Sequence, residues 1–162
     1  MESICCTWGC IPMYNDTITL FNRKEGEAGD TWYPSVLHNV QLNINRASIM
    51  TKDGAQSQDS AVLNIRYTVD AEGKKVGGKR WLPPNEWQAL ADPAQALTFN
   101  SGSKFDFFCF GDWGSEAPVK DADYTADMDF YTYMNRTRDH VFAVSSVGGP
   151  YSVIPHFEIM GK

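Results

Sequence analysis

Apolar and polar residues alternate along two stretches of the chain, residues 36–44 and 60–69. A period of two is typical of β-strands that bury one face and expose the other. In the first stretch the predicted buried face consists of Val36, Val40, Leu42 and Ile44. In the second stretch it consists of Ala61, Leu63, Ile65, Tyr67 and Val69.

The first of these strands belongs to a predicted long hairpin over residues 16–44. Residues 17–21 mix β-branched, apolar and aromatic side chains, as strands do. Residues 22–30 are mostly polar or glycine, which predicts a loop at the tip of the hairpin. Trp32, Tyr33 and Pro34 follow that loop and restart ordered structure, and residues 36–44 form the second strand of the hairpin.

Further strand-like segments lie in the second half of the chain. They are residues 105–110, 128–136, 141–147 and 151–159. Turns are expected at residues 135–140 and at residues 148–150, where two glycines precede a proline. A short helix is expected over residues 85–91, with Asn85 as its N-cap. The pattern therefore predicts a mainly β fold, an antiparallel β-barrel or sandwich with one short helix.

A chain of 162 residues is long enough for one hydrophobic core. We expect an N-terminal extension over residues 1–15 and a single β-rich domain over residues 16–162. The net charge of -6 and the absence of a Lys/Arg stripe exclude a phosphate-binding surface, so no nucleic acid is expected as partner. No apolar run approaches the roughly 20 residues that span a bilayer, so no membrane partner is expected either.

The chain has four cysteines, Cys5, Cys6, Cys10 and Cys109. Three of them crowd the first ten residues, and adjacent cysteines rarely form a disulfide with each other. We expect free thiols in a reducing cytoplasm. The alternative is a thiolate metal site, but the paired spacing of structural zinc sites is missing.

Four carboxylates lie close together in the segment DADYTADMD. They are Asp121, Asp123, Asp127 and Asp129. Calcium prefers such oxygen ligands, so this segment is a candidate metal site. The EF-hand spacing is absent, however, and a solvated acidic strand edge explains the cluster more simply.

No motif in the sequence assembles a catalytic centre. His38, His140 and His156 stand apart from one another, and no nucleophile elbow is present. Ser145, Ser146 and Cys109 would serve as nucleophiles only if the fold brought a base to them. We therefore predict no catalytic residue, no cofactor and no enzymatic activity.

Aromatic residues are abundant in and beside the predicted loops. Trp32, Tyr33 and Trp113 are the candidates for a protein interface, because rigid aromatic side chains anchor such contacts. Loop aromatics on a β-scaffold also stack against sugars, so a carbohydrate-binding β-sandwich module is the alternative function. Packing of these rings into the ends of a barrel is the third interpretation.

Three segments resemble a known group of proteins: DTITLFNR at residues 16–23, WYPSVLHNV at 32–40 and IPHFEIMGK at 154–162. They are similar to small structural proteins encoded in the head and tail gene clusters of tailed phages and Gram-positive prophages. The head-closure and tail-completion branch of that group is a small β-barrel with long loops.

This resemblance implies a non-enzymatic virion protein, a head-tail connector or tail component. Such a protein contacts a portal, adaptor or tail protein. It forms a ring only in the assembled particle, and it resides in the cytoplasm during assembly and then in the virion. The group has no catalytic residues, so none are transferred to this chain.

Overall fold

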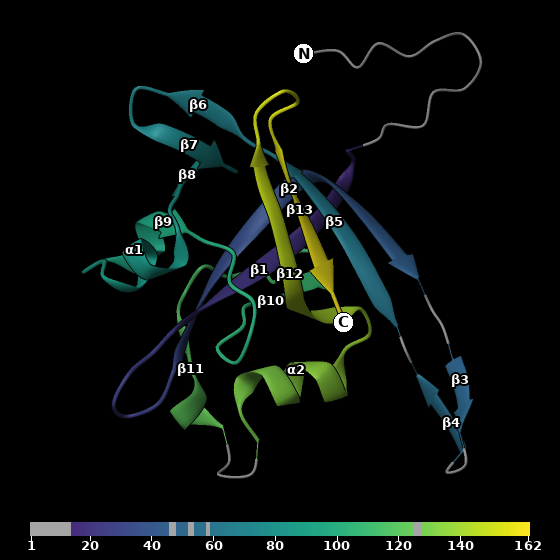
Figure 1. Cartoon of the computed structure of the whole chain (residues 1–162). Helices are drawn as coiled ribbons and strands as arrows, with labels where there is room; N and C mark the ends of the chain where they lie inside the picture. Colours follow the sequence, from purple (N-terminus) through teal and green to yellow (C-terminus); the bar gives the residue numbers. More distant parts are fainter. Residues whose placement is uncertain (1–13, 46–47, 52–53, 58, 125–127) are drawn as a thin grey trace, which may run out of the picture.

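Six antiparallel strands close into a barrel (Figure 1). The computed structural model describes residues 14–45, 48–51, 54–57, 59–124 and 128–162. Around the barrel the strands are β1 (Asp16–Lys24), β10 (Phe107–Phe110), β12 (Val141–Tyr151), β13 (His156–Gly161), β5 (Ser60–Arg66) and β2 (Thr31–Asn45). Pairing of β2 with β1 completes the circle. The predicted fold class, a mainly β chain with an antiparallel barrel, is confirmed.

Smaller elements are attached to this barrel. A mixed sheet is formed by β6 (Thr68–Asp70), β7 (Gly73–Val76), β8 (Lys79–Trp81) and β9 (Ala96–Leu97). A separate hairpin consists of β3 (Ser48–Thr51) and β4 (Gly54–Ser57), and β11 (Val119–Lys120) pairs with the start of β2. The helices are α1 (Pro84–Gln88) and α2 (Phe130–Thr137), with short 3-10 turns at Pro93–Gln95 and Asp121–Asp123.

The barrel interior is filled by the alternating faces of its strands. Ala61, Leu63, Ile65 and Tyr67 are buried, as the period of two predicts. Val69 was expected on the same face, but it is exposed. The barrel strand ends at Arg66, and residues 68–70 pair instead with β7 in the small sheet. The alternation thus ends at the point where the chain leaves the barrel.

A bulge in β2 changes which residues face the core. Ile18 pairs with Leu37 and Asp16 pairs with Val40, so β2 has one residue more than β1 in this interval. Asn39 takes up this extra length with a φ of 57°. Leu37 is therefore buried in place of Val36, whereas Val40, Leu42 and Ile44 pack on the core as predicted.

Residues 22–24 extend β1 instead of forming part of a loop. Asn22 is fully buried and pairs with Tyr33, and Lys24 pairs with Thr31. The loop is therefore limited to residues 25–30. The prediction was wrong here because polar composition alone does not distinguish a loop from a strand whose polar side chains have buried partners.

The segment 128–136 was predicted as a strand, but residues 130–137 form helix α2. Asp129 is its N-cap, and its Oδ1 accepts a hydrogen bond of 2.7 Å from the backbone N–H of Thr132. Phe130 and Met134 are the buried residues of the helix, at an i, i+4 spacing. The aromatic side chains favoured a strand by propensity, whereas packing of this stripe on the barrel decided for a helix.

Helix α1 lies close to its predicted position but is shorter. Pro83 occupies the N-cap position without a side-chain hydrogen bond, so Asn85 is not the cap. Trp87 is its buried residue, and its ring meets Tyr33 edge-on at 5.9 Å. Trp87 thus packs α1 against the start of β2.

The glycines at 148–149 lie within β12, and the turn of the last hairpin follows later, at residues 152–155. The tight turn predicted at residues 148–150 was therefore wrong. This hairpin reaches the upper end of the barrel in Figure 1, opposite to the end at which α2 and β11 lie.

Among the described residues no helix is long and apolar enough to cross a membrane.

Candidate functional site

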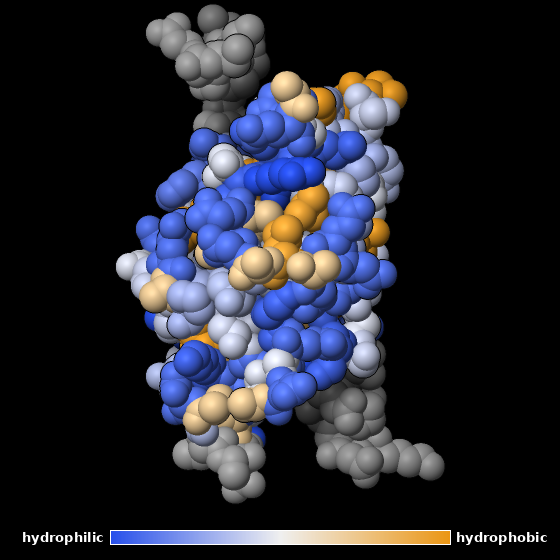
Figure 2. All heavy atoms as spheres, turned by 90° about the vertical axis from the view of Figure 1, so that its left-hand side faces the viewer, coloured by the Kyte–Doolittle hydropathy of each residue, from blue (hydrophilic) through white to orange (hydrophobic). Residues whose placement is uncertain are grey.

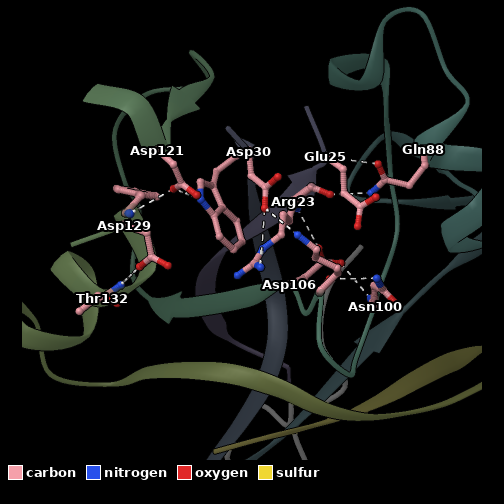
Figure 3. A network of polar contacts seen from close by, with 12 residues as sticks. Arg23, Glu25, Asp30, Gln88, Asn100, Asp106, Asp121, Asp129 and Thr132 are labelled. Carbon is pink, nitrogen blue, oxygen red and sulfur yellow. Dashed lines mark hydrogen bonds and ion pairs between the residues drawn. The ribbon is translucent and has the colours of Figure 1, made fainter. Parts of the chain in front are cut away.

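The lower end of the barrel holds a network of buried polar groups centred on Asp106 (Figure 3). Asp106 is only 1% exposed. Its Oδ1 accepts a hydrogen bond from the backbone N–H of Arg23 at 2.9 Å. Its Oδ2 accepts from Asn22 Nδ2 at 2.9 Å and from the backbone N–H of Asn100 at 2.8 Å. One carboxyl group thus ties β1 to the loop that precedes β10.

Burial raises the pKa of Asp106 to about 7, whereas the N–H groups of Arg23, Asn22 and Asn100 act in the opposite direction. A carboxyl group with such a pKa is a candidate general base by chemistry alone. Here the group is enclosed by the three donors and has almost no face open to a substrate. The arrangement supports a structural tie between segments, not a catalytic group.

Arg23 is held beside this tie by two aromatic rings. Its guanidinium lies 4.4 Å from the centre of the Trp32 ring and 4.7 Å from that of Phe105. Asp30 Oδ2 lies 3.8 Å from Arg23 Nη1. Figure 3 shows Arg23 between Asp30 and Asp106, with Gln88 of α1 beside Glu25. Gln88 Nε2 donates to the carbonyl of Arg23 at 2.6 Å, which fastens α1 to the same strand.

Trp32, the first predicted interface residue, is 0% exposed. Its indole Nε1 donates to Asp121 Oδ1 at 2.7 Å, and the same oxygen accepts from the backbone N–H of Phe130 at 3.1 Å. Its ring packs edge-on against Phe107 at 4.9 Å. The expectation of a surface anchor is wrong for Trp32, because β11 and α2 enclose it.

The other two predicted interface residues are partly buried. Tyr33 packs in a small cluster with Trp87. Trp113 contacts Phe21 at 5.6 Å and lies under the guanidinium of Arg138 at 4.8 Å. Both rings thus have partners within the molecule, as expected of aromatics that close the end of a barrel.

The acidic cluster does not form a cation site within the part of the chain that the structure describes. No group of three or more His, Cys, Asp or Glu side chains converges there. Asp121 and Asp129 accept hydrogen bonds from backbone N–H groups at the start of α2, and Asp123 is exposed beside Lys120. The expected strand edge is a helix N-terminus instead, and Asp127, like Cys5, Cys6 and Cys10, lies outside the described residues.

The candidate nucleophiles Cys109 and Ser145 lie on neighbouring strands of the barrel wall. Cys109 is buried, and burial raises the pKa of its thiol to about 11, so the reactive thiolate is disfavoured. Ser145 donates to the carbonyl of Met160 at 3.1 Å. A surface hollow of about 470 Å³ lies between α2 and β12, and its lining mixes the charges of Asp59, Arg138 and Lys162.

The opposite end of the barrel presents exposed apolar side chains. At the turn of the β12–β13 hairpin Val153 is 96% exposed and Ile154 is 68% exposed. Val69 of β6, 67% exposed, and Tyr151 belong to the same end. We call these four residues the apical patch. Figure 2 shows a mostly hydrophilic face, with apolar atoms protruding at its upper right corner, where the β12–β13 hairpin ends.

This hairpin turn is held in place by contacts from Tyr67 and by contacts within the hairpin. Tyr67 Oη donates to the carbonyl of Tyr151 at 2.6 Å, and the backbone N–H of Tyr67 donates to the carbonyl of Pro155 at 3.3 Å. The ring of His156 stacks on Tyr151 at 4.9 Å, and its Nδ1 lies 2.6 Å from the carbonyl of Ile154. The apolar side chains are therefore presented on a turn whose backbone is already ordered.

The apical patch is suited to binding by insertion. Full burial of a Val or Ile side chain contributes about 1.5–3 kcal/mol. An ordered turn loses little conformational entropy on binding, so more of this contribution appears as affinity. Residues 151–155 carry no charged side chain, which removes one desolvation cost. The arrangement favours a protein contact over catalysis.

Sequence reasoning missed the apical patch because it assigned residues 151–159 to one continuous strand. A usable signal was present. Ser152 and Pro155 flank Val153 and Ile154, and both residue types favour turns. Apolar residues within a predicted turn are the observation that would have indicated an exposed apolar site.

The chain belongs to a family of unknown function (DUF6751), with a match over residues 13–162. No curated protein matches the chain, and no solved structure matches it. The matched range contains both the Asp106 network and the apical patch. Membership of this family therefore leaves the role of the protein to be argued from its own geometry.

Proposed function

We propose that this member of the DUF6751 family is a non-enzymatic structural protein of a tailed phage or prophage. It joins head to tail, or forms part of the tail, through protein–protein contacts. The observation that carries the proposal is the apical patch, in which Val153 and Ile154 stand exposed on an ordered turn. Two neighbouring apolar side chains on one ordered turn offer a compact contact point, unlike apolar residues scattered singly over a surface.

Two further features support the proposal. A small closed β-barrel is the architecture that the resemblance to head-closure and tail-completion proteins implies. The resemblance itself includes residues 154–162, which contain the end of the hairpin turn and all of β13. The partner in this proposal is a portal, adaptor or tail protein, and ring formation takes place on that partner.

The carbohydrate-binding alternative depends on exposed loop tryptophans. Trp32 and Trp87 are fully buried, and Trp81 and Trp113 are partly buried. Sugar stacking needs an open aromatic face, which these four residues do not offer.

Gene neighbourhood gives the first test. Terminase, portal and capsid genes beside this gene are expected under the proposal, whereas neighbouring glycoside hydrolase genes would favour a carbohydrate-binding module.

The second test uses particles assembled with a Val153→Ser/Ile154→Ser variant. We expect loss of incorporation, because a hydroxyl replaces the inserted apolar group on each side chain. Met160→Ser is the matched control, since Met160 is also exposed but lies on the wall of the barrel opposite Val62. Normal incorporation of the double variant would overturn the assignment of the apical patch as the contact.

A further inference from the structure

The charges of the chain are divided unevenly between the end that bears the apical patch and the rest of the molecule. Residues 66–80, which contain β6, β7 and most of β8, carry five Lys or Arg and two Asp or Glu side chains. All remaining residues together carry nine Lys or Arg and eighteen Asp or Glu side chains. A chain with a net charge of -6 thus has one basic region, and Figure 1 places β6 and β7 at the upper end.

The two faces of the β6–β7 hairpin differ in how their charges are compensated. Lys75 Nζ lies 2.9 Å from Asp70 Oδ2 and 3.2 Å from Glu72 Oε2, so both acidic side chains of the hairpin are paired with it. Lys74 is the cross-strand partner of Val69, and successive side chains of a strand point to opposite faces. Lys74 therefore shares its face with the exposed Val69, on the side opposite to the ion pairs of Lys75.

A second cation stands next to the exposed hairpin turn of the apical patch. Arg66 is exposed and is the cross-strand partner of His156, the residue that follows this turn. Its guanidinium carbon lies 3.9 Å from the centre of the Tyr14 ring, a contact that leaves the positive charge in place. Within the part of the chain that the structure describes, neither Arg66 nor Lys74 forms an ion pair with a carboxylate.

We propose that the apical patch docks on an apolar recess of its protein partner that is bordered by Asp or Glu side chains, which pair with Lys74 and Arg66. This inference rests on the proposed function, because the partner is the virion protein that the apical patch contacts. The apolar side chains supply most of the affinity. The two cations fix the orientation of the contact and reject partner surfaces that carry Lys or Arg at the same positions.

An anionic lipid surface would also attract cations beside apolar side chains. Recognition of such a surface through charge typically uses a cluster of about four to eight Lys or Arg side chains. The apical patch has Lys74 and Arg66 beside it, whereas Lys75 is already paired with two carboxylates. Two cations at fixed positions match two carboxylates of a protein better than a continuous charged surface.

Zero-length cross-linking of assembled particles tests the pairing with carboxylates. A water-soluble carbodiimide joins a lysine amine to a carboxylate where the two groups are in direct contact. We expect peptide mapping to find Lys74 joined to an Asp or Glu of another virion protein. The internal products of Lys75 with Asp70 and Glu72 are expected in every sample and serve as the positive control. Formation of the internal products without any product of Lys74 would overturn the proposal.

A charge reversal tests the same contact by competition with the unmodified chain during particle assembly. We expect the share of Lys74→Glu to fall roughly tenfold, because a carboxylate would face the carboxylates of the partner. Lys74→Gln removes the attraction without adding repulsion, so its share should lie between the two. Added salt should narrow the difference, because it screens the repulsion. Lys120→Glu is the matched control, an equal charge change on an exposed side chain of β11 at the other end of the barrel, and equal losses for both reversals would overturn the proposal.

The outcomes separate this inference from the proposed function. Loss of incorporation for Val153→Ser/Ile154→Ser together with a normal share for Lys74→Glu would keep the proposed function and overturn the acidic partner surface. Normal incorporation of the double serine variant would remove the proposed function and the partner surface with it. A carbodiimide product that joins Lys74 to a second copy of this chain would overturn the proposal in favour of self-association. Binding of the purified chain to phosphatidylserine-containing vesicles, abolished in the double serine variant, would overturn it in favour of a lipid surface.

Discussion

The two ends of the barrel treat large apolar side chains in opposite ways. At the lower end Trp32 is 0% exposed under β11 and α2, and its indole N–H has a carboxylate partner. At the upper end Val153 is 96% exposed, and the contacts that surround it order the backbone without covering the side chain. A buried tryptophan thus contributes to the stability of the lower end, whereas a pair of aliphatic side chains protrudes at the upper end.

The difference follows from what each end can use as cover. The lower end has the helix α2, the loop before β10 and a buried carboxyl group, all of which bring hydrogen-bonding partners. At the upper end Tyr67 and Phe157 are buried against each other, but the side chains of the turn at residues 152–155 are exposed. Val153 and Ile154 protrude there and contribute little to folding.

Substitution of the buried tryptophan should give the largest effect. We expect Trp32→Ala to lower the free energy of unfolding by about 3–5 kcal/mol, because it removes a fully buried ring and leaves a cavity. Denaturant unfolding measures this change. Trp113→Ala, at a partly buried ring, should cost clearly less. Equal and small losses of unfolding free energy in both variants would contradict the full burial of Trp32.

Asp106→Asn should rank second. An amide NH2 in place of either carboxyl oxygen would face an N–H donor, so we expect a loss of about 1–3 kcal/mol in unfolding free energy. Asp92→Asn is the matched control, since that exposed side chain makes no capping hydrogen bond. A neutral Asp106→Asn would show that the carboxyl group does not tie the lower end together.

The same variant has a pH signature. The folded-state pKa of Asp106 is raised from 3.8 to about 7, so the folded protein holds this proton more tightly than the unfolded chain. This contribution to stability is complete below pH 3.8 and is lost as the pH rises to about 7. Asp106→Asn lacks this loss, and its deficit relative to the unmodified protein should shrink over that interval. Denaturant unfolding of both proteins at several pH values measures this difference. A difference in unfolding free energy that stays constant with pH would contradict a raised pKa of Asp106.

Tyr67→Phe tests how the upper end is held. The variant removes the hydrogen bond from Tyr67 Oη to the carbonyl of Tyr151, which is worth about 1 kcal/mol. We expect faster amide hydrogen exchange in residues 151–156 with little change elsewhere. Tyr133→Phe, on the exposed face of α2, should leave this exchange unaltered. Unchanged exchange in Tyr67→Phe would mean that the turn is ordered by other contacts.

Val153→Ser should give the smallest effect on stability. The side chain is exposed, so we expect a change within about 0.5 kcal/mol in unfolding free energy. Thermal unfolding of Val153→Ser and Trp32→Ala, measured side by side, would then distinguish a residue that stabilises the fold from one that serves a contact. A large loss for Val153→Ser would place that side chain in the fold and remove the basis of the apical patch.

Sequence reasoning predicted the strands well where one face is buried. The alternation of Ala61, Leu63 and Ile65 predicted β5, because a barrel wall imposes a period of two. It was wrong for residues 130–137, where aromatic propensity favoured a strand although Phe130 and Met134 already stood at helical spacing behind the capping Asp129. Propensity is a weak prior, and the packing of that stripe decided the outcome.

For the interface, sequence reasoning selected aromatic residues, and the structure places them inside or half-inside the molecule. Trp32 has the chemistry of an interface anchor, but an anchor needs exposure, which depends on segments almost ninety residues away, such as Asp121 (a separation of 89). The sequence pattern placed Val153 and Ile154 in a strand. The residue at which β12 ends is set by its pairing with β13, which the local sequence does not reveal.

The sequence by itself determined the class of fold and the residues available for a core, because alternation and turn composition are local properties of the chain. Closure of the barrel depended on tertiary structure. The pairings of β1 with β10 and of β5 with β13 bring together strands from distant parts of the sequence, and the bulge at Asn39 sets which residues of β2 face inward. Exposure was likewise decided by the assembled fold, since burial of Trp32 and protrusion of Val153 depend on which segments arrive to cover each end.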